Sequence, residues 1–242
     1  MIELLARAKL TLSLRVTGVR EDGYHLIDAE MVTVDLADRI EIDPDGDGLE
    51  VIGADGARVD AAITADDDNL VRRALRLCGR TAFVRIHKRI AAGAGLGGGS
   101  ADAAAVLRWA GYRDLVGASR IGADVPFCMV GGRARVRGIG EIVEPLPYED
   151  RQLTLLTPPV HCSTPAVYAA WDALGGPTGE HGNDLEPAAL TVAPELARYR
   201  DELEAETGVR PRLAGSGSTW WVPGAFPGGN RVVVRTVPAE GN

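Results

Sequence analysis

The chain has 242 residues, a formal net charge of −8, and 45% hydrophobic and 25% charged residues. These values are ordinary for a soluble globular protein with one large domain or two small ones that share a core. The acidic balance argues against nucleic acid as a partner. No apolar run approaches the ~20 residues that a membrane span needs, and no signal-peptide h-region is present, so we expect no membrane partner.

Cysteine and lysine usage indicates the cellular compartment and two candidate functional residues. The three cysteines are scattered and have no metal-ligand spacing: Cys78, Cys128 and Cys162. An odd number of such cysteines is typical of a reducing compartment, so we expect a cytoplasmic protein in which they are small buried residues. Only Lys9 and Lys88 among the 26 basic residues are lysines. Because an ammonium and a guanidinium differ chemically, both lysines are candidate functional residues.

The first predicted element is a strand over Leu4–Val16. Its second half alternates leucine or valine with other residues, and this period of two is typical of a half-buried strand. The alternation places Lys9, Thr11 and Ser13 on the face opposite the leucines. A solvated strand face explains these three residues as well as a functional surface does.

The turn over residues 20–25 ends in two aromatic residues, Tyr24 and His25. Packing beside a turn is the simpler explanation of this pair. Their side chains can also stack on a nucleic-acid base and hydrogen-bond to its edge. From the residues alone, both explanations stay open.

The next predicted elements are two strands and a helix. Alternation predicts the strands over residues 29–36 and 39–42. Asp68 or Asn69 is the expected N-cap of the helix. One face of this helix is predicted to be apolar, with Leu70, Ala74 and Leu77.

The most informative stretch is a glycine loop that enters a helix. Five glycines fall within residues 93–99, and Ser100 follows as a good N-cap for a helix over residues 100–110. Such a loop offers amide groups and the positive end of the helix dipole, so a phosphate is its natural ligand. A dinucleotide-binding loop is disfavoured because the preceding residues 83–90 are charged and no acidic residue follows about 20 positions later. The P-loop pattern is absent.

Two charged residues beside this loop, Lys88 and Asp124, can each be explained without a functional role. Lys88 ends the preceding strand, where its ammonium either reaches a nucleotide phosphate or ribose or is simply solvated. Asp124 lies between Gly122 and Pro126, where an aspartate is common as a turn residue or as the cap of a short helix at Pro126. The local pattern does not decide between these roles.

The remainder of the chain alternates strands and helices. A hairpin is predicted over residues 131–146, and the charged stretch after it marks a domain boundary between residues 148 and 149. Beyond this boundary we expect strands at 153–157, 220–222 and 231–237, helices at 164–174 (N-cap Ser163) and 194–207, and a second glycine loop at 213–219.

Five ordered stretches resemble the motifs of the GHMP kinases, a family that phosphorylates small alcohols. They are A-K-L-T-L-S-L from Ala8, D-G-Y-H from Asp22, G-A-G-L-G-G-G-S-A-D-A-A-A from Gly93, I-G-A-D-V-P-F from Ile121, and A-G-S-G-S-T from Ala214. The stretch N-D-L-E-P from Asn183 is also similar to a family motif. The resemblance therefore covers nearly the whole chain, in the right order.

The resemblance implies an α+β fold with two lobes. The expected N-terminal nucleotide-binding lobe spans residues 1–148 and is ribosomal-protein-S5-like. The C-terminal lobe spans residues 149–242 and is ferredoxin-like. A monomer or a homodimer is expected.

It also implies ATP-dependent phosphorylation of the 2-hydroxyl of a cytidine-diphosphate-linked methylerythritol, with ATP and Mg²⁺ as cofactors, in non-mevalonate isoprenoid synthesis. The implied catalytic residues are Lys9 and Asp124. The implied ATP-binding residues are Asn69, Lys88, Gly93, Ala94, Gly95, Leu96, Gly97, Gly98, Gly99, Ser100, Gly215 and Ser216. Thr11, Tyr24 and His25 are implied to bind the acceptor, and Ser100 is a Mg²⁺ ligand candidate.

Three departures from the family pattern keep alternatives open. Thr11 replaces an asparagine, Ala91 replaces a proline, and the segment before Asp124 is short, which predicts a truncated helix there. The alternatives are a GHMP kinase for another small alcohol and a non-catalytic nucleotide-binding homologue. The Tyr24–His25 pair argues against the first, and the presence of both Lys9 and Asp124 argues against the second.

Overall fold

The computed structural model describes residues 1–53 and 68–239. The first part contains β1 (Ile2–Val19), β2 (His25–Asp43), β3 (Gly48–Gly53), α1 (Leu70–Leu77), β4 (Phe83–Lys88), α2 (Gly98–Trp109), α3 (Leu115–Ser119), α4 (Val125–Val130), β5 (Arg133–Gly138) and β6 (Ile142–Leu146). The second part contains β7 (Gln152–Leu156), α5 (Thr164–Ala173), α6 (Glu186–Val192), α7 (Leu196–Thr207), β8 (Arg212–Leu213), β9 (Trp220–Pro223) and β10 (Arg231–Arg235).

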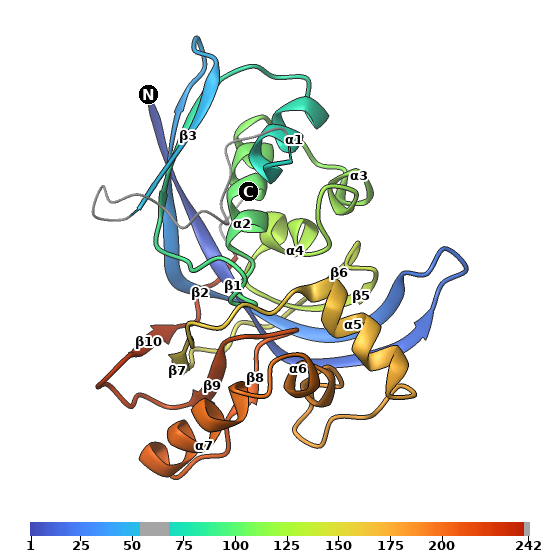
Figure 1. The fold of residues 1–242 in the computed structure, drawn as a ribbon. Helices are drawn as coiled ribbons and strands as arrows, with labels where there is room; N and C mark the ends of the chain where they lie inside the picture. The colour runs from blue at the N-terminus through green and yellow to red at the C-terminus, as the bar shows by residue number, and fades with distance from the viewer. Residues whose placement is uncertain (54–67, 240–242) are drawn as a thin grey trace.

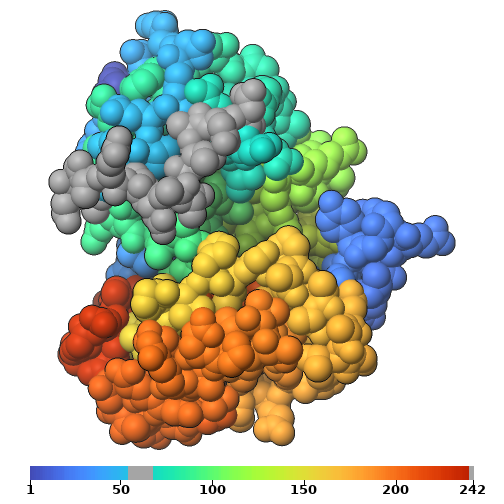
Figure 2. Space-filling model, in the orientation of Figure 1, coloured from blue at the N-terminus to red at the C-terminus, as the bar shows by residue number. Residues whose placement is uncertain are grey.

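Each part has its own sheet. The first is six-stranded, with the order β3-β4-β2-β5-β6 and with β1 paired to β2. The second is four-stranded, with the order β10-β7-β9-β8. Helices α1–α4 gather on one side of the first sheet, and α5–α7 lie with the second part of the chain (Figure 1). The space-filling view shows the second part as a separate lobe below the first (Figure 2). The predicted α+β, two-lobed architecture is confirmed.

The two lobes nevertheless share their core. One buried cluster extends from Val106 of the first lobe to Trp220 of the second, and another joins Leu10 and Ile90 to Trp221. Burial of apolar side chains across this boundary removes them from water, so the lobes stabilise one another. A division between residues 148 and 149 stays a prediction.

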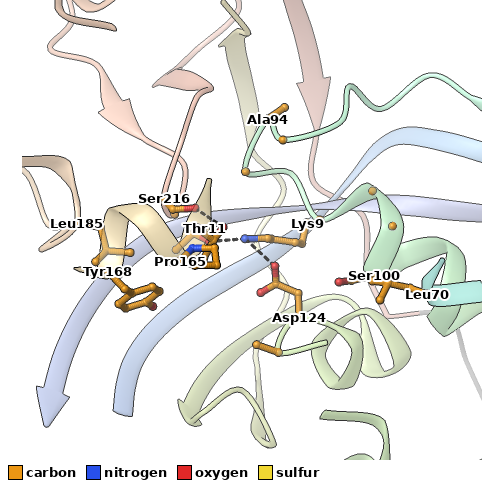
Figure 3. A pocket seen from close by; sticks show the side chains of 18 of the residues that line it. Lys9, Thr11, Leu70, Ala94, Ser100, Asp124, Pro165, Tyr168, Leu185 and Ser216 are labelled. Carbon is orange, nitrogen blue, oxygen red and sulfur yellow. Dashed lines mark hydrogen bonds and ion pairs between the residues drawn. The ribbon is translucent and has the colours of Figure 1, made fainter. Parts of the chain in front are cut away.

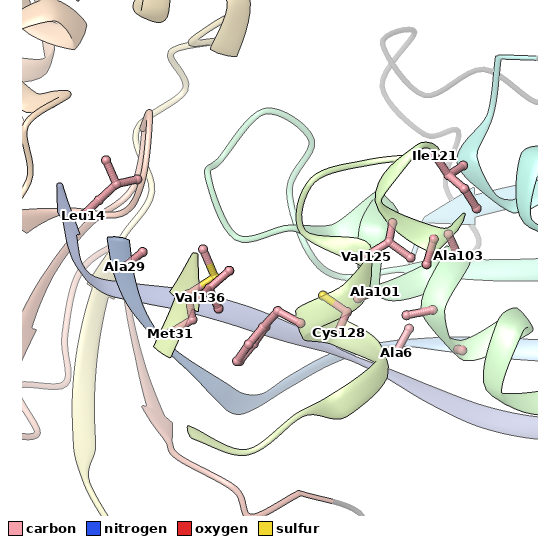
Figure 4. Packing of buried hydrophobic residues seen from close by; sticks show 14 of the residues in the cluster. Ala6, Leu14, Ala29, Met31, Ala101, Ala103, Ile121, Val125, Cys128 and Val136 are labelled. Atoms are coloured by element: carbon pink, nitrogen blue, oxygen red, sulfur yellow. The ribbon is translucent and has the colours of Figure 1, made fainter. Parts of the chain in front are cut away.

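Small residues let the helices behind the glycine loop approach closely. Figure 4 shows Ala101 and Ala103 of α2 next to Val125 and Cys128 of α4, within the larger buried cluster. Because alanine side chains are small, the axes of the two helices can lie close together and pack tightly. This packing places the start of α2 and the start of α4 side by side.

The prediction of a half-buried first strand is only partly right. Residues 8–12 are all buried, polar members included. Ala8, Leu10 and Leu12 belong to a core cluster on one face, and the glycine loops lie beside Lys9 and Thr11 on the other. The two strands predicted at 29–36 and 39–42 form one long strand, β2. Its register against β1 shifts between Arg7, opposite Ala37, and Lys9, opposite Thr33. Such an irregularity changes the local twist and direction of the strand at Lys9.

Predicted helix ends agree with the structure in two cases and fail in one. Asn69 is the N-cap of α1, and its Oδ1 accepts a hydrogen bond from Val71 N at 2.9 Å. Ser163 is the N-cap residue of α5, although its side chain makes no capping hydrogen bond. Ser100 is not an N-cap, because α2 begins earlier, at Gly98, behind Gly97 with φ 68°. The left-handed backbone that glycine permits turns the chain into the helix two residues before the first good capping side chain.

The remaining predictions concern the apolar face of α1, the truncated helix, the cysteines and membrane spans. On α1, Ala74 is buried and Leu70 and Leu77 are partly buried against the core, so the predicted apolar face is confirmed; Val71 is buried beside it. The predicted truncated helix before Asp124 is the five-residue α3. Cys128 and Cys162 are buried and Cys78 is partly buried, all three as free thiols. No helix within the described ranges is long and apolar enough to cross a bilayer.

Candidate active site

A cavity of about 860 Å³ lies between the two lobes. The glycine loop and the start of α2 line one side, β1 and Asp124 line its floor, and α5 and the second glycine loop line the other side (Figure 3). The sequence-predicted residues that line it are Lys9, Thr11, Tyr24, His25, Asn69, Lys88, Gly93, Ala94, Gly95, Gly97, Gly98, Gly99, Ser100, Asp124, Gly215 and Ser216. Such a cavity has the size expected for a small-molecule site.

The glycine loop is shaped by close approaches that a side chain would prevent. Gly93, Gly95 and Gly97 have φ of 67°, 75° and 68°. A Cβ at Gly95 would overlap the carbonyl oxygen of Ala214, and one at Gly97 would lie 2.7 Å from Lys9 Cγ. These contacts explain why glycine is needed at both positions.

Leu96 differs from the other loop residues. Its side chain is buried in the core, where it belongs to the same cluster as Ile90 and Trp221, and it does not line the cavity. Its carbonyl oxygen accepts a hydrogen bond from Lys9 N at 3.0 Å. Leu96 therefore anchors the loop to β1, and any contact with a ligand falls to its backbone.

Lys9 and Asp124 meet in the cavity. Lys9 Nζ lies 3.2 Å from Asp124 Oδ2 and 3.2 Å from Thr11 Oγ1. The Lys9 side chain is 6% exposed and the Asp124 side chain 29%. Asp124 is the N-cap residue of α4, but its side chain makes no capping hydrogen bond. The capping explanation of Asp124 is therefore wrong, and its carboxylate is directed to the ammonium.

Tyr24 and His25 both line the cavity, and His25 packs against α5. Tyr24 is 59% exposed. His25 Nε2 is 2.8 Å from Asp172 Oδ1, and its ring packs against Tyr168 and Trp171 at centroid distances of 4.6 and 5.6 Å. The imidazole is thus held between aromatic rings and hydrogen-bonded to a carboxylate from the other lobe.

Sequence reasoning missed the contribution of α5. Tyr168 and Asp172 line the cavity, although nothing near them in sequence marked them as site residues. The available signal was the spacing of Tyr168 and Trp171, three residues apart on a predicted helix, which puts both rings on one face.

The second glycine loop is fixed by the N-D-L-E-P stretch. Asn183 Nδ2 donates to the carbonyl oxygens of Leu213 and Gly215 at 2.9 and 2.7 Å. Asp184 accepts hydrogen bonds from the Arg15 side chain at 2.5 Å and from Val16 N at 3.0 Å. These two buried side chains therefore attach the second loop to β1, next to the first loop.

Three other predicted residues sit at the edges of the cavity. Asn69 uses its side chain to cap α1. Ser100 is in the first turn of α2, and Figure 3 shows it pointing toward Asp124. Lys88 is buried and donates to Asp38 and to Asp102. Burial lowers the pKa of the Lys88 ammonium, but the charges of Asp102 and Asp38 outweigh that effect and raise it above its usual value.

Fold, loop and acid–lysine pair together define a class of small-molecule kinases. Residues 69–132 match the model of the GHMP kinases N terminal domain. The structure is also similar to that of a mevalonate kinase, with a TM-score of 0.58 at 12% identity, over 98% of this chain and all of that one. The second likeness shows the shared fold alone.

Closer relatives define the family. The chain is 39% identical to the 4-diphosphocytidyl-2-C-methyl-D-erythritol kinase of Cereibacter sphaeroides, over 99% of this chain and 95% of that protein. It is 39% identical to the enzyme of the same name from Paracoccus denitrificans, over 88% of this chain and 84% of that protein. A crystal structure of 4-(cytidine 5'-diphospho)-2C-methyl-D-erythritol kinase superposes with a TM-score of 0.77 at 30% identity, covering 99% of this chain and all of that one. The chain belongs to this family of kinases.

Proposed function

We propose that this protein transfers the γ-phosphoryl group of ATP to the 2-hydroxyl of 4-diphosphocytidyl-2-C-methyl-D-erythritol, a step of the non-mevalonate isoprenoid pathway. One observation carries the proposal: the Lys9–Asp124 pair lies in one cavity with the glycine loop and with the Tyr24–His25 pair. A phosphate-binding loop, a base and an aromatic site for a nucleobase are the three parts that this transfer needs.

The chemistry follows from the pair. The acceptor hydroxyl loses its proton to Asp124 as its oxygen attacks the γ-phosphorus, and the bond from that phosphorus to the β–γ bridging oxygen breaks to leave ADP. Lys9 orients the hydroxyl and offsets the negative charge on the transferred group. Thr11 holds the Lys9 ammonium from the other side, at 3.2 Å.

The phosphates of ATP are bound at the glycine loop and the N-terminus of α2, where amide groups and the helix dipole favour an anion. Asn69 is a further proposed contact of the nucleotide. Tyr24 and His25 bind the cytosine ring by stacking and hydrogen bonding. The acceptor thus spans the cavity from α5 to Asp124.

Magnesium fits this site only together with the phosphates. Among the described residues there is no group of three or more His, Cys, Asp or Glu side chains that could hold a metal ion. Mg²⁺ commonly binds through phosphates and one or two protein ligands, so the Ser100 hydroxyl is its proposed protein ligand. When bound, the ion offsets phosphate charge. We also propose a cytoplasmic location, which the three free thiols support.

The test is ADP release by the purified protein with Mg-ATP, with and without 4-diphosphocytidyl-2-C-methyl-D-erythritol. We expect release that depends on this acceptor and disappears in Asp124→Asn. Release only with other alcohols would overturn the proposed acceptor. No release with any alcohol, despite ATP binding, would identify a non-catalytic homologue.

A further inference from the structure

Three charged residues form a buried cluster behind the glycine loop. Lys88, at the end of β4, donates hydrogen bonds to Asp38 of β2 and, at 2.8 Å, to Asp102 of α2. Asp38 is fully buried, Asp102 is 3% exposed and Lys88 is 9% exposed. Burying charged groups costs free energy, and the pairing of Lys88 with two carboxylates offsets part of that cost.

The cluster holds the entry of the loop. Asp38 Oδ1 accepts hydrogen bonds from Arg89 N at 2.5 Å and from Ile90 N at 2.8 Å, while its other oxygen accepts from Lys88. Arg89 and Ile90 are the residues that lead from β4 into the glycine loop. One carboxylate therefore fixes the backbone of the loop entry and orients the ammonium.

The same ammonium holds the exit. Asp102 lies in α2, just past the last glycine of the loop, and its Oδ2 accepts from Lys88. A Cβ at Gly98 would lie 3.0 Å from the Ile90 side chain and 3.2 Å from Lys88 Nζ. The entry and exit of the loop are therefore packed against each other and linked through a single nitrogen atom.

The charges oppose a direct contact between Lys88 and phosphate. With both aspartates ionised the cluster carries a net charge of −1, and with one of them protonated it is neutral. Neither state attracts an anion, and two of the three N–H donors of Lys88 are already used. A lysine that binds phosphate needs its charge and its donors available.

We propose that Lys88 is a positioning residue: the Asp38–Lys88–Asp102 cluster fixes the spacing between the two ends of the glycine loop and thereby sets nucleotide affinity, without Lys88 touching the nucleotide. The proposal rests on the proposed function only in taking this loop as the phosphate site. It replaces the direct ATP contact expected of Lys88 from the sequence.

The experiment measures binding of a non-hydrolysable ATP analogue with Mg²⁺ by calorimetry. The variants are Lys88→Met, Asp38→Asn and the double variant, with Asp43→Asn on the same strand as the matched control. Asparagine has one acceptor oxygen, so residue 38 then serves either the loop amides or Lys88, in either orientation. We expect each single variant to bind about tenfold more weakly and the double variant to bind no worse than the weaker single one, because the residues act as one unit.

Steady-state rates and hydrogen exchange give further readouts. For Asp38→Asn we expect a raised KM for ATP, an unchanged KM for the acceptor and an unchanged kcat at saturating ATP. Amide exchange of residues 89–99 speeds up while that of the second lobe does not. This local exchange keeps the proposal testable even if Lys88→Met does not fold, since Asp38→Asn preserves size and shape.

Two results would overturn the proposal. If Asp38→Asn binds the analogue as tightly as the wild type or more tightly while Lys88→Met loses binding, Lys88 is a direct phosphate ligand. If neither substitution alters affinity or exchange at residues 89–99, the cluster does not position the loop. A wild-type protein that binds the analogue but phosphorylates no acceptor defeats the proposed function and leaves this test intact.

Discussion

Lys9 Nζ lies 3.2 Å from Asp124 Oδ2, although Lys9 belongs to the first strand and Asp124 precedes the fourth helix. The pair meets because α2 packs against both β1 and α4 and brings the start of α4 to the strand. At this distance the ammonium and the carboxylate attract each other directly. The pair is therefore the first target for mutation.

Asp124→Asn removes the proton acceptor and keeps the size of the side chain. We expect kcat to fall about a hundredfold or more, the scale of a lost general base, while the Kd for ATP changes little. Initial rates of ADP release measure the effect. Asp201→Asn on α7, with a side chain 60% exposed, is the control. Normal turnover of Asp124→Asn would remove the base assignment.

Lys9→Met tests the ammonium while keeping most of the stem that passes Gly97. We expect kcat to fall about a hundredfold, because the charge is required mainly in the transition state, with the Kd for ATP within about threefold of wild type. On the same preparations, turnover measurements give kcat and calorimetry gives the Kd for ATP. Intact turnover with lost ATP binding would make Lys9 a nucleotide ligand instead.

Gly95→Ala tests the contact between the two glycine loops. The new methyl group overlaps the carbonyl oxygen of Ala214, so the loops must separate and ATP binding should weaken about tenfold or more. Gly111→Ala is a matched control, since its φ is also positive, at 73°, but no atom lies within 4 Å of the new Cβ. Equal ATP binding by the two variants contradicts the loop contact.

We expect the His25–Asp172 pair to make the site selective for cytosine over uracil in the acceptor. When Nε2 donates to Asp172, Nδ1 is left as an acceptor, which suits the amino group of cytosine and not the carbonyl group of uracil. Asp172→Ala should raise the KM for the cytidine acceptor about tenfold and reduce its preference over the uridine analogue, with the KM for ATP unchanged. Asp172→Asn, which keeps an acceptor oxygen, should lose less. An unchanged preference in Asp172→Ala refutes this role.

The buried cluster predicts a pH dependence of stability. Burial raises the pKa of Asp102 from 3.8 to about 7, and Lys88 only partly offsets this. The folded state therefore loses stability as pH rises from about 4 to about 7, because the unfolded chain releases this proton more readily. Relative to Asp102→Asn, the wild-type free energy of unfolding should fall by up to about 1.4 kcal/mol per pH unit in that window. Urea unfolding at several pH values measures the difference, which would stay constant if Asp102 did not titrate there.

Local features were the most predictable from the sequence. Alternation located β1, and residues of the N-cap type, Asn69 and Ser163, located the starts of α1 and α5. The start of α2 was misjudged by two residues because a glycine backbone, and not the Ser100 side chain, begins the helix. Glycine permits several conformations, so its neighbours in space decide which one it adopts.

The two lysines show where sequence reasoning ends. Lys9 and Lys88 both end up buried beside aspartates. The sequence could not tell that Lys88 has two carboxylate partners, because Asp38 and Asp102 come from a distant strand and a helix. In the same way, no residue near His25 in the sequence indicated that Asp172 would be its partner.

The sequence by itself determined the order of the elements, the glycine loop and the family motifs, because these depend on backbone preferences and on neighbours a few residues apart. Only the tertiary structure decided which charged groups are partners: Lys9 with Asp124 on the floor of the cavity, and Lys88 with Asp38 and Asp102 behind the glycine loop. The physical reason is that Coulomb interactions and burial depend on distance in space. Packing of the two lobes around a shared core sets those distances.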